Sequence, residues 1–256
     1  PQLQKLADLG AVRLTEVELN RDPYATIEQV EESVQLNDSQ ASAVLAIQEA
    51  EAGETLLVHG VTGSGKTEVY LESIGQVIDE GKQAILLVPE ISLTPMMVKR
   101  FKRRFGDRVA VLHSALSKGE KYDEWRKIKR NEVDVVVGAR SAIFAPLDRL
   151  GLIILDEEHE TTYKQEENPR YHARDVAIWR ARYHGCPVVL GSATPSLESY
   201  ARAQKGVYRY LHLKERYGGE MPPVHIIDMR RELAKGNTTM FSEELFQGIL
   251  DRIEKK

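Results

Sequence analysis

The feature that most constrains this chain is a glycine-rich loop directly after a short apolar run, in the segment TLLVHGVTGSGKT (55–67). Glycines at positions 60, 63 and 65 allow backbone conformations that other residues resist, so successive N–H groups can point inward around an anion. The helical pattern that follows, EVYLESIGQVI (68–78), adds the positive end of a helix dipole at the same point. The segment therefore predicts the phosphate-binding loop of a nucleotide hydrolase.

The polar residues of this loop have expected roles. The Lys66 ammonium can reach the β- and γ-phosphates of a nucleotide, and the Thr67 hydroxyl can bind Mg²⁺. The other loop residues that we expect around the phosphates are Gly60, Thr62, Gly63, Ser64 and Gly65. A glycine-rich turn that merely contains a lysine is the alternative. The apolar run before the loop and the helical pattern after it argue against that alternative.

Short apolar runs alternate with amphipathic helical segments from residue 56 onward. The runs are LLVH (56–59), AILLV (84–88), VAVL (109–112), VDVVV (133–137), LIIL (152–155) and PVVL (187–190). Most are continuous, which is typical of strands buried on both faces of a parallel sheet. We expect an α/β fold with a doubly wound, mostly parallel sheet and with its ligand site at the carboxyl ends of the strands. A further strand at 224–228 and a helix from residue 242 to the last residue are also expected.

Two more motifs directly follow predicted strands. The run LIIL ends in Asp-Glu-Glu-His (156–159), and a carboxylate at such a point can hold Mg²⁺ beside the phosphates. We assign that role to Asp156, and we assign to Glu157 the polarisation of the attacking water. The turn GSATPS (191–196) follows the next run, and its small hydroxyl residues could bond the acidic motif and sense the γ-phosphate. In isolation, it would be an ordinary turn with Ser196 as the N-cap of a helix.

The composition narrows the classes of protein. The single cysteine, Cys186, excludes internal disulfides and is expected in the core, and no Cys/His cluster has zinc spacing. No apolar stretch approaches about 18 residues and no signal pattern opens the chain, so we expect a cytoplasmic protein with no membrane partner. The chain begins at Pro1 in the middle of a sequence pattern and ends at Lys255 and Lys256 within a helical pattern, so we expect it to be a fragment of a longer protein.

The net charge of −4 says little about partners, because local basic patches occur on acidic proteins. Two such patches are KRFKRR (99–104) and RKIKR (126–130). Either patch can contact nucleic acid, or it can be a solvated helix face, which is the commoner case.

Together, GVTGSGKT, DEEH and SATPS resemble motifs I, II and III of the superfamily 2 helicases, and the wording is similar to that of bacterial replication-restart helicases. The resemblance implies a RecA-like lobe that uses ATP and Mg²⁺. It implies that Gln40, in LNDSQ, recognises adenine and that His159, Ser192 and Thr194 couple the motifs. The segments LLVPEISLTPMM (86–97, with Met96 in place of the usual glutamine) and VVVGARSAIFAPL (135–147, with Arg140) would touch the nucleic-acid backbone.

The resemblance also implies an organisation. Residues 1–33 would be the end of a winged-helix-like domain or a linker, 34–230 the first motor lobe, and 231–256 a connection toward a second lobe that the chain lacks. The implied partners are single-stranded and forked DNA, the primosome proteins and single-stranded DNA-binding protein. Zinc is expected in another part of the complete protein and not in this chain.

The segment after DEEH, ETTYKQEENPRY (160–171), has no helical or strand period, so we expect an irregular loop. The resemblance implies that this loop couples DNA binding to hydrolysis. Aromatic rings there could stack on bases and cations could meet phosphates. The first set is Tyr163, Tyr171 and His172, and the second is Lys164, Arg170 and Arg174. An ordinary surface loop is the alternative. Trp179, in the helical stretch that follows, is expected in the core.

An ATP-dependent DNA helicase, travelling 3′→5′ and restarting stalled forks by resemblance, is the leading hypothesis. A DNA-stimulated ATPase that remodels nucleoprotein without unwinding is the alternative. A GTPase is disfavoured because no NKxD segment is present, and a small-molecule kinase because a SAT turn stands where an arginine-rich lid is usual. Without a second lobe to supply an arginine finger, we expect the chain alone to hydrolyse ATP very slowly.

Overall fold

The computed structural model describes residues 5–6, 9, 11–12, 35–216 and 224–255. The chain forms two compact units, Pro1–Gly218 and Gly219–Lys256. The break falls at residues 218/219, whereas the sequence suggests a boundary at 230/231. Most of the predicted N-terminal appendage, residues 1–33, lies outside the described residues.

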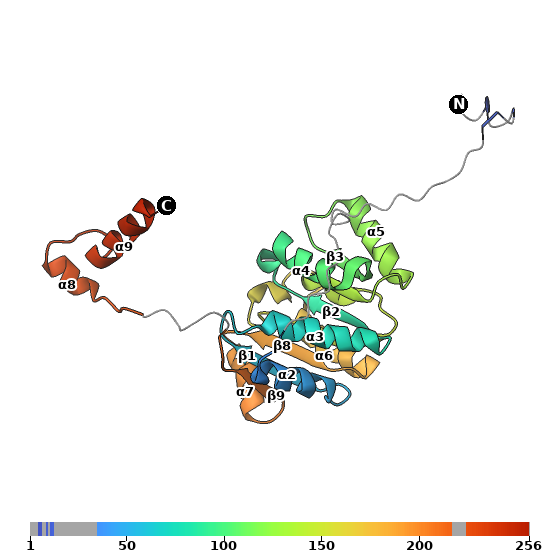
Figure 1. The fold of residues 1–256 in the computed structure, drawn as a ribbon, viewed down its shortest axis with the longest axis horizontal. Coiled ribbons are helices and arrows are strands. Elements are labelled where there is room, and N and C mark those ends of the chain that lie inside the picture. The colour runs from blue at the N-terminus through green and yellow to red at the C-terminus, as the bar shows by residue number, and fades with distance from the viewer. Residues whose placement is uncertain (1–4, 7–8, 10, 13–34, 217–223, 256) are drawn as a thin grey trace. The chain divides into compact units, whose positions relative to one another are not determined.

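A seven-stranded parallel sheet forms the centre of the first unit (Figure 1). Its spatial order is β3-β4-β2-β5-β8-β1-β9, and every neighbouring pair is parallel. The strands are β1 (Thr55–Gly60), β2 (Gln83–Leu87), β3 (Val109–Leu112), β4 (Val135–Gly138), β5 (Leu150–Leu155), β8 (Val188–Ser192) and β9 (Arg209–Leu213). The sheet confirms the predicted α/β fold, and six of its strands coincide with the six apolar runs.

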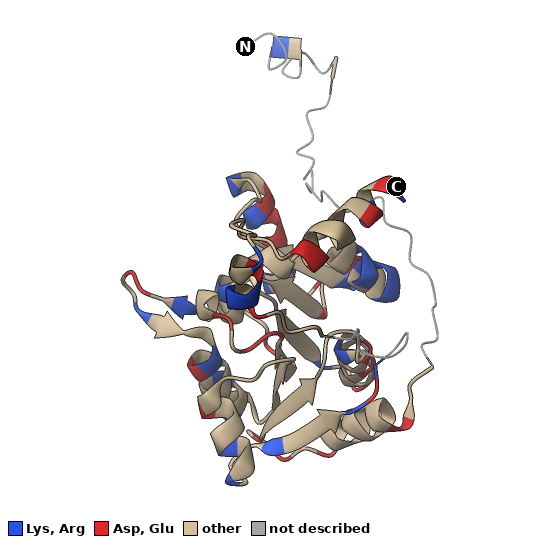
Figure 2. Ribbon diagram, turned by 90° about the vertical axis from the view of Figure 1, so that its left-hand side faces the viewer, with Lys and Arg blue, Asp and Glu red and all other residues tan. Residues whose placement is uncertain are grey.

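Helices cover both faces of the sheet. The helices α2 (Asp38–Gln48), α3 (Lys66–Asp79) and α4 (Pro95–Phe105) pack with one face, and α5 (Lys118–Lys129), α6 (Ala173–His184) and α7 (Leu197–Gln204) contribute to the core on the other. Short 3₁₀ turns are η1 (Glu90–Ser92), η2 (Gly106–Arg108), η3 (Arg140–Phe144) and η4 (Thr161–Tyr163). Charged residues lie on the helices and loops, and the central strands are almost without them (Figure 2), as expected for strands buried on both faces.

Local signals set the helix starts. Asn37 and Gln40 form a capping box at α2, and Ser117 and Glu120 form another at α5. Helix α7 begins after Ser196, whose hydroxyl accepts from the Ser199 N–H, as the N-cap alternative predicts. The sequence therefore determines where these helices begin through residues within one turn of the start.

The strand prediction fails at two places. The edge strand β9 was not predicted, because RYLHL alternates polar and apolar residues and has no continuous apolar run. The predicted strand at 224–228 is wrong: the segment is irregular, and Val224 and Ile226 are more than four-fifths exposed. An apolar run without a neighbouring strand to pair with does not become a strand.

The predicted core position of Trp179 is also wrong. Its side chain is 66% exposed on α6, where it stacks on Tyr183 with ring centroids 5.6 Å apart. The helix instead buries its alanines at 173, 177 and 181, so the small residues face the sheet. Cys186 is buried, as predicted.

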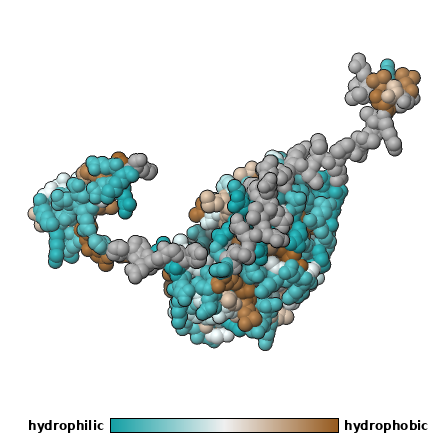
Figure 3. All heavy atoms as spheres, viewed as in Figure 1, coloured by the Kyte–Doolittle hydropathy of each residue, from teal (hydrophilic) through white to brown (hydrophobic). Residues whose placement is uncertain are grey.

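The second unit contains α8 (Met229–Ala234) and α9 (Glu243–Glu254), and α9 confirms the helix that was predicted for the chain end. Both units expose some apolar side chains between hydrophilic ones (Figure 3). Among the described residues, no helix is both long and apolar enough to cross a membrane.

Candidate nucleotide-binding site

The glycine-rich loop lies between β1 and α3, at the carboxyl edge of the sheet. Gly63 and Gly65 have φ of +82° and +80°, a backbone region that other residues seldom adopt. A Cβ at Gly60 would lie 2.4 Å from the Ser64 hydroxyl, which is buried without a hydrogen-bond partner. The loop is therefore wound so tightly that only glycines fit at these points, and its N–H groups can surround an anion.

Gln40 is attached to this loop. Its side chain is buried, and Nε2 donates to the carbonyl of Ser64 at 2.9 Å while Oε1 accepts from the Asn37 N–H at 2.9 Å. A Cβ at Gly65 would lie 2.1 Å from the same Nε2. The residue expected to recognise adenine thus also supports the phosphate loop, which the sequence alone did not indicate.

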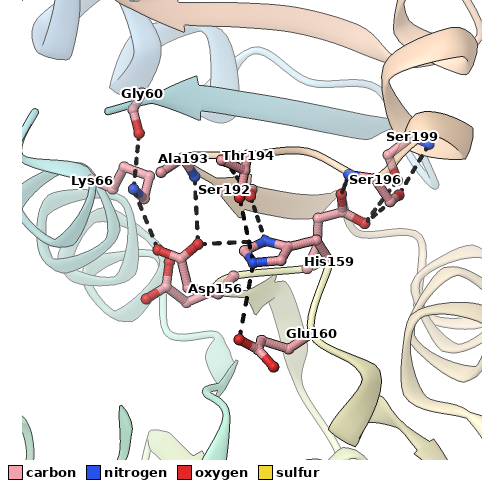
Figure 4. A network of polar contacts seen from close by, with 12 residues as sticks. Gly60, Lys66, Asp156, His159, Glu160, Ser192, Ala193, Thr194, Ser196 and Ser199 are labelled. Atoms are coloured by element: carbon pink, nitrogen blue, oxygen red, sulfur yellow. Dashed lines mark hydrogen bonds and ion pairs between the residues drawn. The ribbon is translucent and has the colours of Figure 1, made fainter. Parts of the chain in front are cut away.

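Lys66 connects the loop to the acidic motif. Its ammonium donates to the Gly60 carbonyl at 2.9 Å (Figure 4). The ammonium also lies 3.5 Å from Glu157 Oε1, and the Lys66 side chain is only 9% exposed. Glu157 itself has φ of +45°, in the left-handed region that is strained for a residue with a side chain. Strain of this kind is concentrated at functional sites.

Asp156 is half-buried beside Glu157. Burial and then the adjacent Glu157 carboxylate raise the pKa of Asp156 to about 6. The Tyr70 hydroxyl donates to its Oδ1 at 3.0 Å, and the Tyr163 hydroxyl donates to its carbonyl at 2.6 Å. A half-buried carboxylate of raised pKa beside a phosphate loop would gain from a cation, which makes Asp156 a fitting ligand for Mg²⁺.

The SAT turn reaches the acidic motif through His159. The Ser192 hydroxyl and His159 Nδ1 are 2.7 Å apart, and the Thr194 hydroxyl and His159 Nε2 are 3.4 Å apart (Figure 4). The Ala193 N–H also donates to Glu157 Oε2 at 3.4 Å. The expected contact between the hydroxyl residues and the acidic motif is therefore present, although the two segments are more than 30 residues apart.

The loop after the acidic motif is more ordered than predicted. It contains η4 and an antiparallel hairpin, β6 (Lys164–Gln165) paired with β7 (Tyr171–His172). Arg140 donates to the carbonyls of Thr162 and Lys164 and lies over the Tyr171 ring at 5.9 Å. An arginine that was expected to contact DNA thus also holds the base of this hairpin.

Four other residues of this region that were predicted to contact DNA differ in the exposure of their side chains. Lys164 and Arg170 are exposed, with the Lys164 ammonium 3.0 Å from Glu166, and Tyr171 is half-buried against Phe144. His172 is half-buried as the N-cap of α6, where burial lowers its pKa. Contact of these four residues with nucleic acid stays a prediction.

Two of the predicted DNA contacts are corrected by the structure. Tyr163 is 1% exposed, so its ring is in the core and cannot stack on a base. Arg174 turns inward to the buried Glu158, with Nη1 3.5 Å from Oε2, and cannot serve a phosphate in this position. The sequence pattern did not reveal either burial, because the residues that enclose them come from distant segments.

The segments predicted to touch the nucleic-acid backbone meet in one cleft of about 530 Å³ at the ends of β2, β3 and β4. Residues 88–90, 112–114 and 139–141 line it, together with Lys121 and Trp125. Trp125 is 41% exposed and was not predicted, because α5 lies between the recognisable segments. Of the two basic patches, the one on α4 pairs Arg100 and Arg104 with acids of α3, which favours a solvated helix face.

A parallel sheet with a phosphate loop, an acidic motif in contact with the loop lysine and a hydroxyl turn bonded to that motif is the arrangement of a P-loop nucleotide-hydrolase lobe. The sequence agrees, because residues 37–203 match the family described as DEAD/DEAH box helicase. The chain belongs to this family.

Individual relatives describe the similarity more narrowly than the family does. The chain is 58% identical to the replication restart protein PriA of Bacillus subtilis (strain 168), over 99% of the chain and 32% of the relative. It is 48% identical to that of Synechocystis sp. (strain PCC 6803), over 95% of the chain and 30% of the relative. The chain thus spans about a third of the length of these curated relatives.

Solved structures agree on the fold. RecG bound to a three-way DNA junction has a TM-score of 0.51 and 26% identity, over 75% of this chain and 25% of that chain. The helicase domain of Pyrococcus furiosus Hef has a TM-score of 0.50 and 19% identity, over 70% of this chain and 38% of that chain. The latter likeness concerns the fold alone.

Proposed function

We propose that this chain is the first motor lobe of an ATP-dependent DNA helicase that restarts stalled replication forks in the bacterial cytoplasm. The observation that carries the proposal is the placement of Lys66 between the Gly60 carbonyl and the Glu157 carboxylate. That placement joins the phosphate loop to the acidic motif at the carboxyl edge of a parallel sheet. The relatives named replication restart protein PriA supply the biological role, and RecG on its junction supplies branched DNA as the class of substrate.

The site fits a nucleoside triphosphate with Mg²⁺. The positive φ of Gly63 and Gly65 and the lack of room for a Cβ at Gly60 support a loop whose backbone N–H groups would surround the phosphates. Lys66, at the start of α3, adds positive charge where the helix dipole is also positive. Thr67 and Asp156 would hold the metal, which would supply charge neutralisation at the phosphates.

The chemistry of the protein groups follows from their positions. Glu157 would orient and polarise the attacking water, and Lys66 would leave its contact with Glu157 to meet the phosphates. His159, Ser192 and Thr194 form the contact by which a change at the γ-phosphate would reach the SAT turn. Gln40 would read adenine from a position fixed by the Ser64 carbonyl.

Single-stranded DNA would bind on the same edge of the sheet. The cleft at the ends of β2, β3 and β4 and the exposed cations of the hairpin, Lys164 and Arg170, provide its surface. Travel in the 3′→5′ direction, and partners such as the primosome proteins and single-stranded DNA-binding protein, follow from the resemblance. We place the N-terminal residues in the end of a winged-helix-like domain and residues after 230 in a connection to a second lobe.

The lysine tests the proposal. In the full-length protein, Lys66→Ala should lower ATP hydrolysis at least about 100-fold, because the ammonium that stabilises the phosphates is lost. Binding to forked DNA should stay within about twofold, because Lys66 lies away from the cleft. Lys205→Ala, at the exposed end of α7, is the control and should keep full activity. Normal hydrolysis by Lys66→Ala would refute the site.

A second assay separates the two classes of motor. Strand separation of a forked duplex by the wild type supports the helicase. DNA-stimulated hydrolysis that displaces bound protein but separates no strands would support the remodelling translocase. Residues 1–256 by themselves should bind ATP weakly and hydrolyse it very slowly, because stabilisation of the transition state would need an arginine from outside them.

A further inference from the structure

Glu158 is the one acid of the DEEH motif for which the site chemistry gives no role. Its side chain has no exposed surface, and its neighbours in the motif face the phosphate loop or the SAT turn. A carboxylate is rarely buried without partners because desolvation of its charge is costly. Its partners therefore indicate what it does.

Hydrogen-bond donors surround the Glu158 carboxylate. Oε1 accepts from the Ser196 N–H at 2.7 Å, and Oε2 accepts from the Ser199 hydroxyl at 2.8 Å and from the Ser196 hydroxyl at 3.2 Å. Arg174 Nη1 lies 3.5 Å from Oε2 and supplies the opposite charge. The carboxylate also lies at the N-terminus of α7, where the helix dipole favours a negative charge.

These contacts fix the SAT turn at both of its ends. The Glu158 main-chain N–H donates to the carbonyl of Gly191, the first residue of the turn, at 3.0 Å, while the Glu158 side chain holds Ser196, the last residue of the turn. Between these two anchor points lie Ser192 and Thr194, which contact His159 (Figure 4). Glu158 therefore joins both ends of the turn to the acidic motif, on either side of the His159 contacts.

The same carboxylate is linked to the hairpin. Arg174 lies in the first turn of α6, two residues after β7 ends. Its N–H donates to His172 Nδ1 at 3.2 Å, and its guanidinium also reaches the Ser199 hydroxyl at 3.3 Å. A displacement of the hairpin would thus move a charge that contacts both Glu158 and α7.

We propose that Glu158 is a positioning residue for DNA-stimulated ATP hydrolysis. It holds Ser192 and Thr194 against the acidic motif and, through Arg174, makes their placement depend on the hairpin that would contact DNA. This inference rests on the proposed function, since the stimulation by DNA is part of it. It assigns no contact between Glu158 and the nucleotide.

Glu158→Gln tests the proposal because it keeps the shape and removes the charge. The amide would present N–H groups to the donors of Ser199 and Arg174, so the contacts would be lost on that side. Glu198→Gln, an exposed acid on α7, is the matched control. In the full-length protein, we expect the ratio of ATP turnover with DNA to turnover without DNA to fall about tenfold in Glu158→Gln. ATP affinity and the DNA-independent rate should stay within about twofold of the wild type.

Hydrogen exchange gives an independent readout. In Glu158→Gln, the amide hydrogens of residues 192–194 and 196–199 should exchange about tenfold faster than in the wild type, while those of the phosphate loop should exchange at the wild-type rate. In the control Glu198→Gln, exchange should not change in either segment. Unchanged exchange at 192–199 would overturn the positioning role. Equal loss of turnover with and without DNA, or no loss at all, would overturn the coupling.

The two proposals can fail separately. If the wild type shows no stimulation by DNA, the proposed function fails, and hydrogen exchange alone then decides whether Glu158 positions the turn. If the wild type is stimulated and Glu158→Gln keeps its full ratio, the proposed function stands and this inference is wrong.

Discussion

The hydroxyl of Tyr70 donates a hydrogen bond to Oδ1 of Asp156 at 3.0 Å, which joins α3 to the acidic motif. Tyr70 is fully buried, and burial raises its pKa well above the usual range, so it remains a protonated donor. Gly191 leaves room for this hydroxyl, because a Cβ there would lie 1.6 Å from it. The tyrosine therefore orients the carboxylate that we expect to hold Mg²⁺.

Tyr70→Phe removes this donor and one oxygen. We expect the Mg²⁺ concentration for half-maximal ATP hydrolysis to rise about tenfold, since a hydrogen bond to a charged group is worth about 1.5–3 kcal/mol. Titration of the full-length protein with Mg²⁺ measures this. Tyr122→Phe, at an exposed position on α5, is the control. An unchanged Mg²⁺ requirement would mean that the hydroxyl does not orient Asp156.

Gly65→Ala should disturb the phosphate loop more than a comparable change elsewhere. The new Cβ would meet Gln40 Nε2 at 2.1 Å, in addition to the strain of a positive φ. Gly81→Ala carries only the strain, because its φ is +73° and its Cβ would meet nothing within 4 Å. We expect a loss of nucleotide affinity in Gly65→Ala alone, measured by calorimetry. Equal affinities in the two variants would contradict the Gln40 contact.

Tyr163 and Trp179 exchange the roles that the sequence suggested for them. Tyr163→Ala should destabilise the fold by about 3–5 kcal/mol, because a buried ring and its hydrogen bond to the Asp156 carbonyl are lost. Trp179→Ala should cost less than about 1 kcal/mol, because that ring is mostly exposed. Urea unfolding of both variants measures the difference. A larger loss for Trp179→Ala would contradict the burial described here.

Cys186 should react slowly with thiol reagents in the native protein. Burial raises the pKa of this thiol to about 11 from an ordinary value of 9.0, so at pH 8 the thiolate fraction falls from about one in ten to about one in a thousand. Reactivity should rise with pH up to about 11, because the thiolate is the reactive form. Absorbance after addition of an aromatic disulfide reports on it, and denatured protein, in which the thiol is exposed, is the control. Fast native reaction at pH 8 would contradict the burial.

Part of the site was predictable because its signals are local. The loop at 60–67, the acids at 156–157 and the turn at 191–196 each directly follow an apolar run, and parallel strands bring such points to one edge. The roles of Tyr163, Arg174 and Glu158 were not predictable in this way. Each role depends on whether segments distant in the sequence enclose the side chain. A local periodic pattern of residues does not indicate such enclosure.

The family, the parallel α/β sheet and the positions of the nucleotide motifs could be recognised from the residues alone. Continuous apolar runs and glycine spacing determine local structure within a few residues, so they can be recognised in the sequence. The folded chain was needed to show that Tyr163 belongs to the core, that Arg174 turns to Glu158 and that β9 completes the sheet. The physical reason is that burial and charge pairing are set by contacts between residues far apart in sequence, whose energies exceed local preference.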